Sequence, residues 1–331
     1  MKIVTLEQNC CPGFSNMPPK CAHELTGKVI KGAVAGHWST LVWDDEGTVF
    51  GRGYNQSGEL GIGQERPTHR FVPIWSLIGQ FIVDVQCSIW HTVFLTRDGR
   101  VFTCGSNRFG QLSNGTYEGT DVPQQVRGVL DDKFIIGIAV GPCCTFFWSD
   151  KGQVFSCGNN YYGQLGLGDN NDRSLAEEII TLRGKVLKEI VCGELHCLAA
   201  VSGDVYVWGD NLHCQLGDFS HLEKVLVPTR VQWMSDAMRI ECGQHVTLIL
   251  DKEKRVHVFG EDACKTRNVL KLNDPSMTFV VSHFFVGCCS CGEASSPIVN
   301  IIQRFKELES QNLDWFGRTH YWSTSVICIA K

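Results

Sequence analysis

The chain has 331 residues, of which 43% are hydrophobic and 20% charged, and its formal net charge is −5. This apolar content is enough for a large core, so intrinsic disorder is excluded as the main state. The slight acidity argues against direct nucleic-acid binding, because phosphate contacts need an excess of Lys and Arg. Glycine is enriched, with 34 residues against 10 prolines, which indicates glycines at defined structural positions rather than a low-complexity linker.

The N-terminal region and the longest apolar stretch bear on localisation. The first 14 residues reach Glu7 and Asn9 before any apolar run of signal-peptide length, so we expect no export. The stretch Phe134–Trp148 is interrupted by Gly137 and Pro142 and is too short to span a bilayer. These features predict a cytoplasmic protein without a membrane span, with the nucleus as the alternative.

Two phrases recur along the chain with a period near 51 residues. The first reads G-x-N-x-x-G-Q-L-G, and its copies are spaced by 52, 53, 51 and 51 residues. The second is a small residue, a short gap, often His, Ser or Thr, and then an apolar run; its spacings are 52, 53, 52, 50 and 49. Two phrases with one period indicate a repeat architecture. The first phrase begins at Gly53, Gly105, Gly158, Gly209 and, in a degraded copy, Gly260, and the second at positions 36, 88, 141, 193, 243 and 292.

Each period predicts about four short strands. Thr92–Thr96 and Val101–Thr103 are apolar runs joined by Arg97–Arg100, which contains an Asp-Gly turn and is typical of a hairpin. The glycine-rich phrase then forms a tight loop, and two further strands follow, such as the one expected at Phe81–Val85. Strands this short must stack on neighbouring units, and four-stranded units repeated radially are propeller blades. The fold class is therefore an all-β, four-stranded antiparallel β-propeller.

The length sets the number of blades. The 331 residues contain about 6.5 periods, so we expect seven blades, with six as the alternative, and a terminal blade assembled from both chain ends because an open sheet edge invites aggregation. The chain is then a single domain over 1–331, with clear repeats over 33–262 and ring closure by 263–331 together with 1–32. A strand at Ile298–Ile302, one short helix over Gln303–Glu309 and closing strands at 315–317 and Tyr321–Ile329 are expected within that region.

The 17 cysteines are expected to be free thiols in a reducing compartment. Cys288 and Cys291 form a C-x-x-C pair near His283, but a structural zinc site usually has a second ligand pair at similar spacing. That pair would have to come from Cys10, Cys11 and Cys21, so neither a metal site nor a cofactor is predicted. Several other cysteines lie in apolar runs and are expected to pack as small hydrophobic side chains: Cys87, Cys104, Cys157, Cys192 and Cys242.

One stretch resembles the repeat of a known family. Asp98–Leu112, which reads D-G-R-V-F-T-C-G-S-N-R-F-G-Q-L, and the C-G-x-x-H-T phrase about 30 residues later are similar to the repeat of the regulator of chromosome condensation family. The resemblance implies a β-propeller. It does not specify the function, because such propellers occur in nucleotide-exchange factors, ubiquitin-ligase subunits, kinase-associated domains and a plant ultraviolet-B photoreceptor.

The resemblance also implies where a partner binds. In the founding exchange factor the GTPase contacts come largely from loops that hold the G-x-x-H phrase. Glu194 and Glu293 are the exchange candidates, because an acidic side chain there would draw away a GTPase lysine or disturb the magnesium site, although the family has Asp at comparable places. The predicted partner-binding residues are His37, Trp38, Trp90, His91, Glu194, His196, Gln244, His245 and Glu293.

Several of these residues also fit purely structural roles. The repeat histidines His91, His196 and His245 are more typical of hydrogen bonds to the backbone within their own blade than of partner contacts, and Trp38 and Trp90 fit interface anchors and ordinary packing about equally well. At the position of Cys104, Trp208 is expected in the core and Arg52 at the channel or at a solvent-facing edge.

Motifs for intrinsic catalysis are missing from the sequence. It has neither a G-x-G-x-x-G fingerprint leading into a helix nor a G-K-[ST] phosphate loop. We therefore predict a monomeric protein–protein interaction propeller, a scaffold or partner-recognition module that binds another protein through loops on one face. The alternative is a guanine-nucleotide exchange factor for a small Ran-like or Rab-like GTPase; a long wedge-like insertion and a basic N-terminal tail, which would favour it, are not seen.

Overall fold

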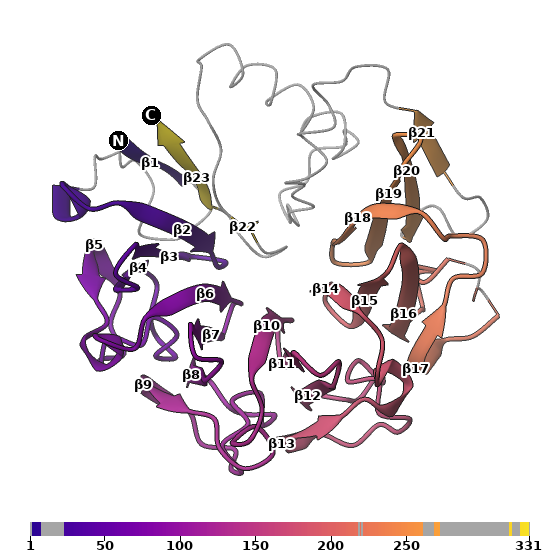
Figure 1. Cartoon of the computed structure of the whole chain (residues 1–331), viewed down its shortest axis with the longest axis horizontal. Coiled ribbons are helices and arrows are strands. Elements are labelled where there is room, and N and C mark those ends of the chain that lie inside the picture. Colours follow the sequence, from indigo (N-terminus) through magenta and orange to yellow (C-terminus); the bar gives the residue numbers. More distant parts are fainter. Residues whose placement is uncertain are drawn as a thin grey trace.

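The protein forms a ring of small antiparallel sheets around a central axis (Figure 1). The computed structural model describes residues 2–7, 23–217, 219, 221–260, 268–271, 318–319 and 325–330. Within that part the strands form five blades and one separate two-stranded sheet. Three short 3-10 helices also occur there, at His23–Leu25 (η1), Trp75–Leu77 (η2) and Ile180–Leu182 (η3).

Each blade follows the predicted period and consists of four sequential strands. The first strand of a blade lies nearest the centre of the ring and the fourth lies at the rim (Figure 1). Blade 1 is β2 (Ile30–Ala35), β3 (Ser39–Asp44), β4 (Val49–Gly53) and β5 (Thr68–Pro73). Blade 2 is β6 (Ile82–Cys87), β7 (His91–Thr96), β8 (Val101–Gly105) and β9 (Thr120–Gln125). Blade 3 is β10 (Ile135–Val140), β11 (Cys144–Ser149), β12 (Val154–Gly158) and β13 (Arg173–Glu178).

The last two blades in the described residues have the same order. Blade 4 is β14 (Leu187–Cys192), β15 (His196–Val201), β16 (Asp204–Asp210) and β17 (Lys224–Arg230). Blade 5 is β18 (Ala237–Cys242), β19 (Val246–Asp251), β20 (Arg255–Gly260) and β21 (Asn268–Lys271). A short strand, β22 (Arg318–Thr319), adds to blade 1 by pairing in parallel with β2.

The first glycine of the G-x-N-x-x-G phrase ends the third strand in blades 1, 2, 3 and 5, and in blade 4 the strand extends one residue further, to Asp210. Gly105 shows why a side chain is excluded there. Its φ is +110°, and a Cβ atom would lie 2.4 Å from the carbonyl oxygen of Trp90. Glycine therefore lets the third strand turn away directly beneath the loop that joins the first two strands.

The core lies between neighbouring blades. The second strand of every blade is buried along its whole length. Trp208 is fully buried between blades 3 and 4, and its indole N–H donates to the Gln164 carbonyl at 2.8 Å, which confirms its predicted core position. Arg52 was expected at the channel or at a solvent-facing edge. That expectation is wrong, because Arg52 is 8% exposed and its guanidinium lies over the Phe71 ring.

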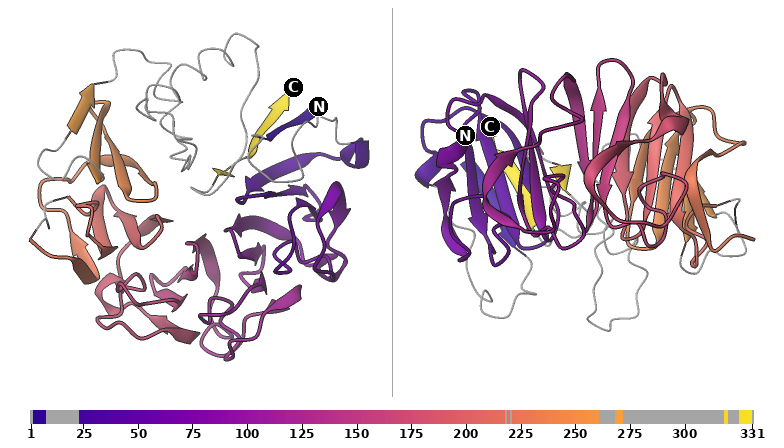
Figure 2. Two further views of the ribbon diagram at one scale, coloured as in Figure 1. Left: turned by 180° about the vertical axis from the view of Figure 1, so that it is seen from behind. Right: turned by 90° about the horizontal axis from the view of Figure 1, so that it is seen from below.

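The two chain ends meet, as predicted. β1 (Lys2–Glu7) pairs antiparallel with β23 (Ser325–Ala330) over its full length. Both ends lie beside blade 1, and the side view shows strands running through the thickness of a disc (Figures 1 and 2). Residues 272–317 lie outside the described residues. The predicted helix at Gln303–Glu309 and the remaining blades of a seven-bladed ring fall on this segment and stay predictions.

Two further expectations concern membranes and thiols. In the part of the chain that the structure describes, no helix has the length and apolar character needed to cross a membrane. The apolar stretch Phe134–Trp148 is instead the hairpin of β10 and β11. All nine cysteines whose side chains are described are free thiols, in agreement with the prediction.

Candidate functional site

Two sets of loops emerge on one side of the disc. In an antiparallel four-stranded blade, the connection between the first and second strands and the connection between the third and fourth strands lie at the same end. The first set carries six of the predicted partner-binding residues, and the second set is the G-x-N-x-x-G phrase. These six are His37, Trp38, Trp90, Glu194, Gln244 and His245. We call this side the loop face.

A hydrogen bond joins the two loops within a blade. In blade 2 the amide of Ser106 donates to the Trp90 carbonyl at 2.8 Å. Because the same bond recurs in four blades, the loops share one backbone framework on which only the side chains differ. The other three bonds, each 2.9 Å, run from Tyr54 to Trp38, from Asn159 to Cys143 and from Asp210 to Leu195.

The recurring letters of the phrase stabilise its own loop. In blade 2 the Asn107 side chain accepts from the Leu112 amide at 2.9 Å, and the Gln111 side chain accepts from the Phe109 amide at 3.0 Å. Such bonds satisfy the buried amides of a tight turn. In blade 1 the position of Gln111 is taken by Glu59, which accepts from the Ser57 amide at 2.9 Å. Burial raises the pKa of Glu59 to about 7.

Aromatic side chains gather on the loop face of blade 1. The His37 and Trp38 ring centroids are 4.2 Å apart, and the Trp38 ring meets Tyr54 edge-on at 5.1 Å. His37 and Trp38 are partly exposed. Trp90 follows on blade 2 and is 40% exposed. These three predicted residues therefore present apolar surface to solvent, which suits an interface anchor.

A polar group lies at the junction of blades 4 and 5. The Glu194 carboxylate is 3.5 Å from Nε2 of His245, whose ring stacks on His213 at a centroid distance of 4.2 Å. The Glu194 amide donates to the Gln244 carbonyl at 3.3 Å, which links the two loops. The structure thus brings together three predicted residues, Glu194, Gln244 and His245, and all three are partly exposed.

Two predicted contacts are corrected by burial. His91 and His196 are both 0% exposed, so their side chains do not reach a partner on the surface. Each instead bonds to a threonine of the next blade: Nε2 of His91 lies 2.8 Å from Thr145 Oγ1, and Nε2 of His196 lies 3.1 Å from Thr247 Oγ1. Burial lowers the pKa of His196 to about 3, so this ring is neutral.

Three other predictions fall outside the described residues. Glu293, the second exchange candidate, lies there, as do Cys288 and Cys291 of the C-x-x-C pair. They stay predictions.

Sequence reasoning missed a hollow on the outer part of the loop face. It measures about 660 Å³ and lies between blades 2 and 3. Tyr117 and Tyr161, which line it, are 55% and 67% exposed. The sequence feature that could have indicated this hollow is the pair of variable residues between the Asn and the second Gly of each G-x-N-x-x-G phrase. This pair is Arg-Phe in blade 2 and Tyr-Tyr in blade 3. The remaining lining residues are Phe109, Asn159, Asn170, Asn171 and Asp172.

Comparison with known proteins identifies relatives with different functions. The chain is 29% identical over 240 residues to the ultraviolet-B receptor UVR8 of Arabidopsis thaliana, a match covering 71% of this chain and 54% of UVR8. It is 30% identical over 238 residues to the human E3 ubiquitin-protein ligase HERC2, covering 70% of this chain but 5% of HERC2. The match therefore spans about half of one relative and a small part of the other.

Solved structures show the same fold. Human WBSCR16 superposes with a TM-score of 0.67 at 21% identity, covering 84% of this chain and 80% of that one. Yeast RCC1 (Prp20), solved bound to Kap60, superposes with a TM-score of 0.66 at 22% identity, covering 78% and 64%. The fold is an all-β propeller with a blade count of about seven to eight. The profile of the RCC1-like domain matches residues 7–262, and the chain belongs to this RCC1-like β-propeller family.

Proposed function

We propose that this propeller is a protein-binding module whose partner lies across the loop face. The observation that carries the proposal is the repeated backbone framework, in which the same hydrogen bond fixes the loops of four blades while the exposed side chains change from blade to blade. A rigid scaffold with variable loops is suited to specific recognition and needs no chemistry of its own.

The chemistry of the loop face differs between its two ends. Blades 1 and 2 offer His37, Trp38 and Trp90, whereas the junction of blades 4 and 5 offers Glu194 and His245. Partly exposed aromatic side chains serve as anchors, and a charged or polar rim gives orientation. A partner that covers both ends would match an apolar patch to blade 1 and a basic or hydrogen-bonding group to Glu194.

Exposed tryptophans on opposite faces provide a matched test. Trp90 is 40% exposed on the loop face. Trp75 is 70% exposed and belongs to η2, which connects the fourth strand of blade 1 with the first strand of blade 2. Connections of this kind lie on the other face of the disc. Affinity purification followed by quantitative mass spectrometry of the wild type, Trp90→Ala and Trp75→Ala compares the two. We expect Trp90→Ala to lose specific partners that Trp75→Ala retains. Equal retention by both variants would contradict a partner on the loop face.

Nucleotide exchange is the second candidate function, and Glu194 favours it. Among the described loops between first and second strands, Glu194 carries the one carboxylate, and its contact with His245 holds it on the loop face. The yeast structure of Prp20p is described together with its binding to Gsp1p and histones, so this fold supports such a partner in a relative.

A panel of small GTPases loaded with labelled nucleotide tests exchange. The control is Glu46→Ala, which removes an exposed carboxylate from the turn between β3 and β4, on the opposite face of blade 1. Exchange is supported if nucleotide release is accelerated by the wild type and by Glu46→Ala but not by Glu194→Ala. If no GTPase in the panel responds and stable partners are still captured, the binding module stands without exchange.

A further inference from the structure

Neighbouring blades are joined by side-chain hydrogen bonds near the loop face. Between blades 2 and 3 the bond is His91 to Thr145, and between blades 4 and 5 it is His196 to Thr247. Between blades 1 and 2, Cys87 Sγ lies 3.4 Å from Ser39 Oγ, and within blade 2 it also accepts from Thr92 Oγ1 at 3.2 Å. The residues of each pair that spans two blades are about one period apart.

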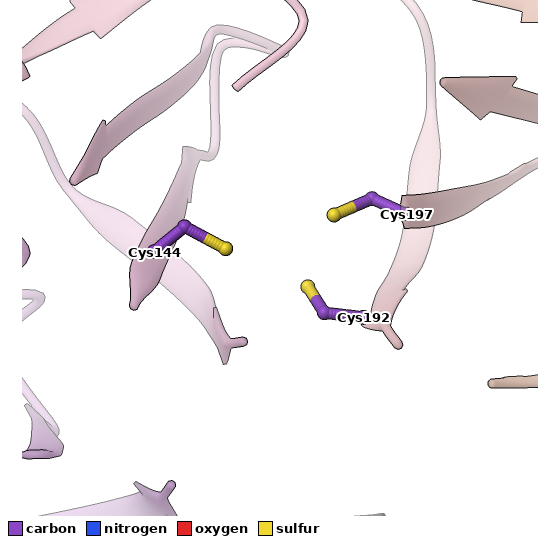
Figure 3. A group of neighbouring side chains, drawn as sticks. All are labelled: Cys144, Cys192 and Cys197. Carbon is purple, nitrogen blue, oxygen red and sulfur yellow. The ribbon is translucent and has the colours of Figure 1, made fainter. Parts of the chain in front are cut away.

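The junction of blades 3 and 4 is filled by three thiols instead (Figure 3). Cys144 of β11, Cys192 at the end of β14 and Cys197 of β15 point toward one another, and their sulfur atoms all lie within 4.8 Å of one another. Cys144 pairs with Gly158 as His91 pairs with Gly105, and Cys197 pairs with Trp208 as Thr145 pairs with Cys157. The cluster thus occupies the place of the His–Thr pair.

The donor set restricts what the cluster can bind. Thiolates select soft ions such as Cu(I), Zn(II) and iron–sulfur clusters. A structural Zn(II) site needs four ligands, whereas this group, as far as the described residues extend, holds three His, Cys, Asp or Glu side chains. Cys144 and Cys197 are buried, and Cys192 is partly exposed.

We propose that Cys144, Cys192 and Cys197 form a three-sulfur site for one Cu(I) ion. On binding, each coordinating thiol loses its proton to solvent and forms one copper–sulfur bond, and copper keeps its +1 state, so no oxidant or reductant is required. The ion connects β11 of blade 3 with β14 and β15 of blade 4. It takes the place of the His–Thr hydrogen bond that joins the blades at the two neighbouring junctions.

The repeat itself supplies a variant designed to fold. Cys144→His combined with Cys197→Thr gives this junction the His, Cys and Thr side chains found between blades 4 and 5, at His196, Cys242 and Thr247. Cys104→Ser removes a buried thiol outside the cluster and is the matched control. Circular dichroism and thermal melting establish that each variant folds.

The experiment is an anaerobic titration of the fully reduced chain with Cu(I) held by bicinchoninate as a competing chelator. Because the chain has other cysteines, the measured quantity is the difference between variants. We expect the double variant to bind one equivalent less than the wild type, with a matching loss of sulfur-to-copper ultraviolet absorption, while Cys104→Ser keeps both. The wild type should thus bind one copper ion that the double variant does not bind. X-ray absorption should show three sulfur ligands around that ion.

Three results would overturn the site. The first is equal copper stoichiometry in the wild type and the folded double variant. The second is a nitrogen or oxygen ligand in the X-ray absorption spectrum, or a higher affinity for Zn(II) than for Cu(I) in a parallel competition. The third is a disulfide among the three cysteines, found by alkylation and peptide mapping of the purified chain, together with no copper binding after reduction.

Discussion

Glu59 is the odd residue at a position that three other blades fill with glutamine. Glu59 is 1% exposed, and its counterparts Gln111, Gln164 and Gln215 are equally buried. All four side chains accept a hydrogen bond from the amide two residues earlier, at 2.9 to 3.0 Å. The substitution Glu59→Gln therefore keeps the bond and removes an ionisable group from the interior.

The size of the effect follows from the pKa of Glu59. Burial, together with a smaller contribution from the charge of Glu65, raises this pKa from 4.5 to about 7 in the folded state. Below pH 4.5 the carboxyl is neutral in both the folded and unfolded states. As the pH rises from 4.5 through 7, the unfolded state loses its proton first, so the folded state is progressively destabilised. Because a tenfold change in proton affinity corresponds to about 1.36 kcal/mol, the full cost is about 3 kcal/mol above pH 7.

Urea unfolding from pH 4.5 to pH 8, followed by tryptophan fluorescence, measures this difference. We expect Glu59→Gln to be more stable than the wild type by about 3 kcal/mol at pH 8 and nearly equal to it at pH 4.5. Gln111→Glu is the matched reverse variant and should introduce the same pH-dependent loss in blade 2. A stability difference between Glu59→Gln and the wild type that does not change between pH 4.5 and 8 would refute the reasoning.

Three further substitutions test the packing of the blades. His196→Gln should make stability less dependent on pH on the acid side. The pKa of His196 is 6.5 in the unfolded state and about 3 in the folded state, so the wild type loses stability as the pH falls below 6.5. Urea unfolding at pH 7 and pH 5 measures the change. Gly105→Ala should cost about 2 kcal/mol or more and weaken partner binding, because its Cβ meets the loop of Trp90; normal unfolding and binding would contradict this. Trp208→Phe should cost about 1 to 3 kcal/mol in urea unfolding, because the Gln164 carbonyl loses its indole donor and keeps only the weaker Cys197 thiol; an unchanged midpoint would argue against the indole bond.

The fold was predictable from the sequence because a propeller repeats its local chemistry. The hairpin expected around Arg97–Arg100 is the turn between β7 and β8, and the glycine phrase lies at the end of the third strand of each blade. The meeting of the two chain ends also followed from the need to close a sheet edge. The parallel pairing of β22 with β2 had no sequence signal, because two residues carry no periodicity.

The side-chain roles were less predictable, because they depend on contacts between blades. His91 and His196 share their phrase with exposed residues, yet the pleat of the second strand turns both rings into the next blade. Metal-ligand motifs are recognised in a sequence by cysteines that lie close together along the chain. Cys144 and Cys197 are 53 residues apart and meet because that separation is one blade.

The most direct test of the loop face is photo-crosslinking from single positions of the intact chain. A benzophenone amino acid placed at Trp90 or at Trp75 samples the two faces of the same disc in the presence of a captured partner. We predict a crosslinked partner from position 90 and none from position 75. Crosslinking from position 75 alone would place the partner on the opposite face and contradict the account.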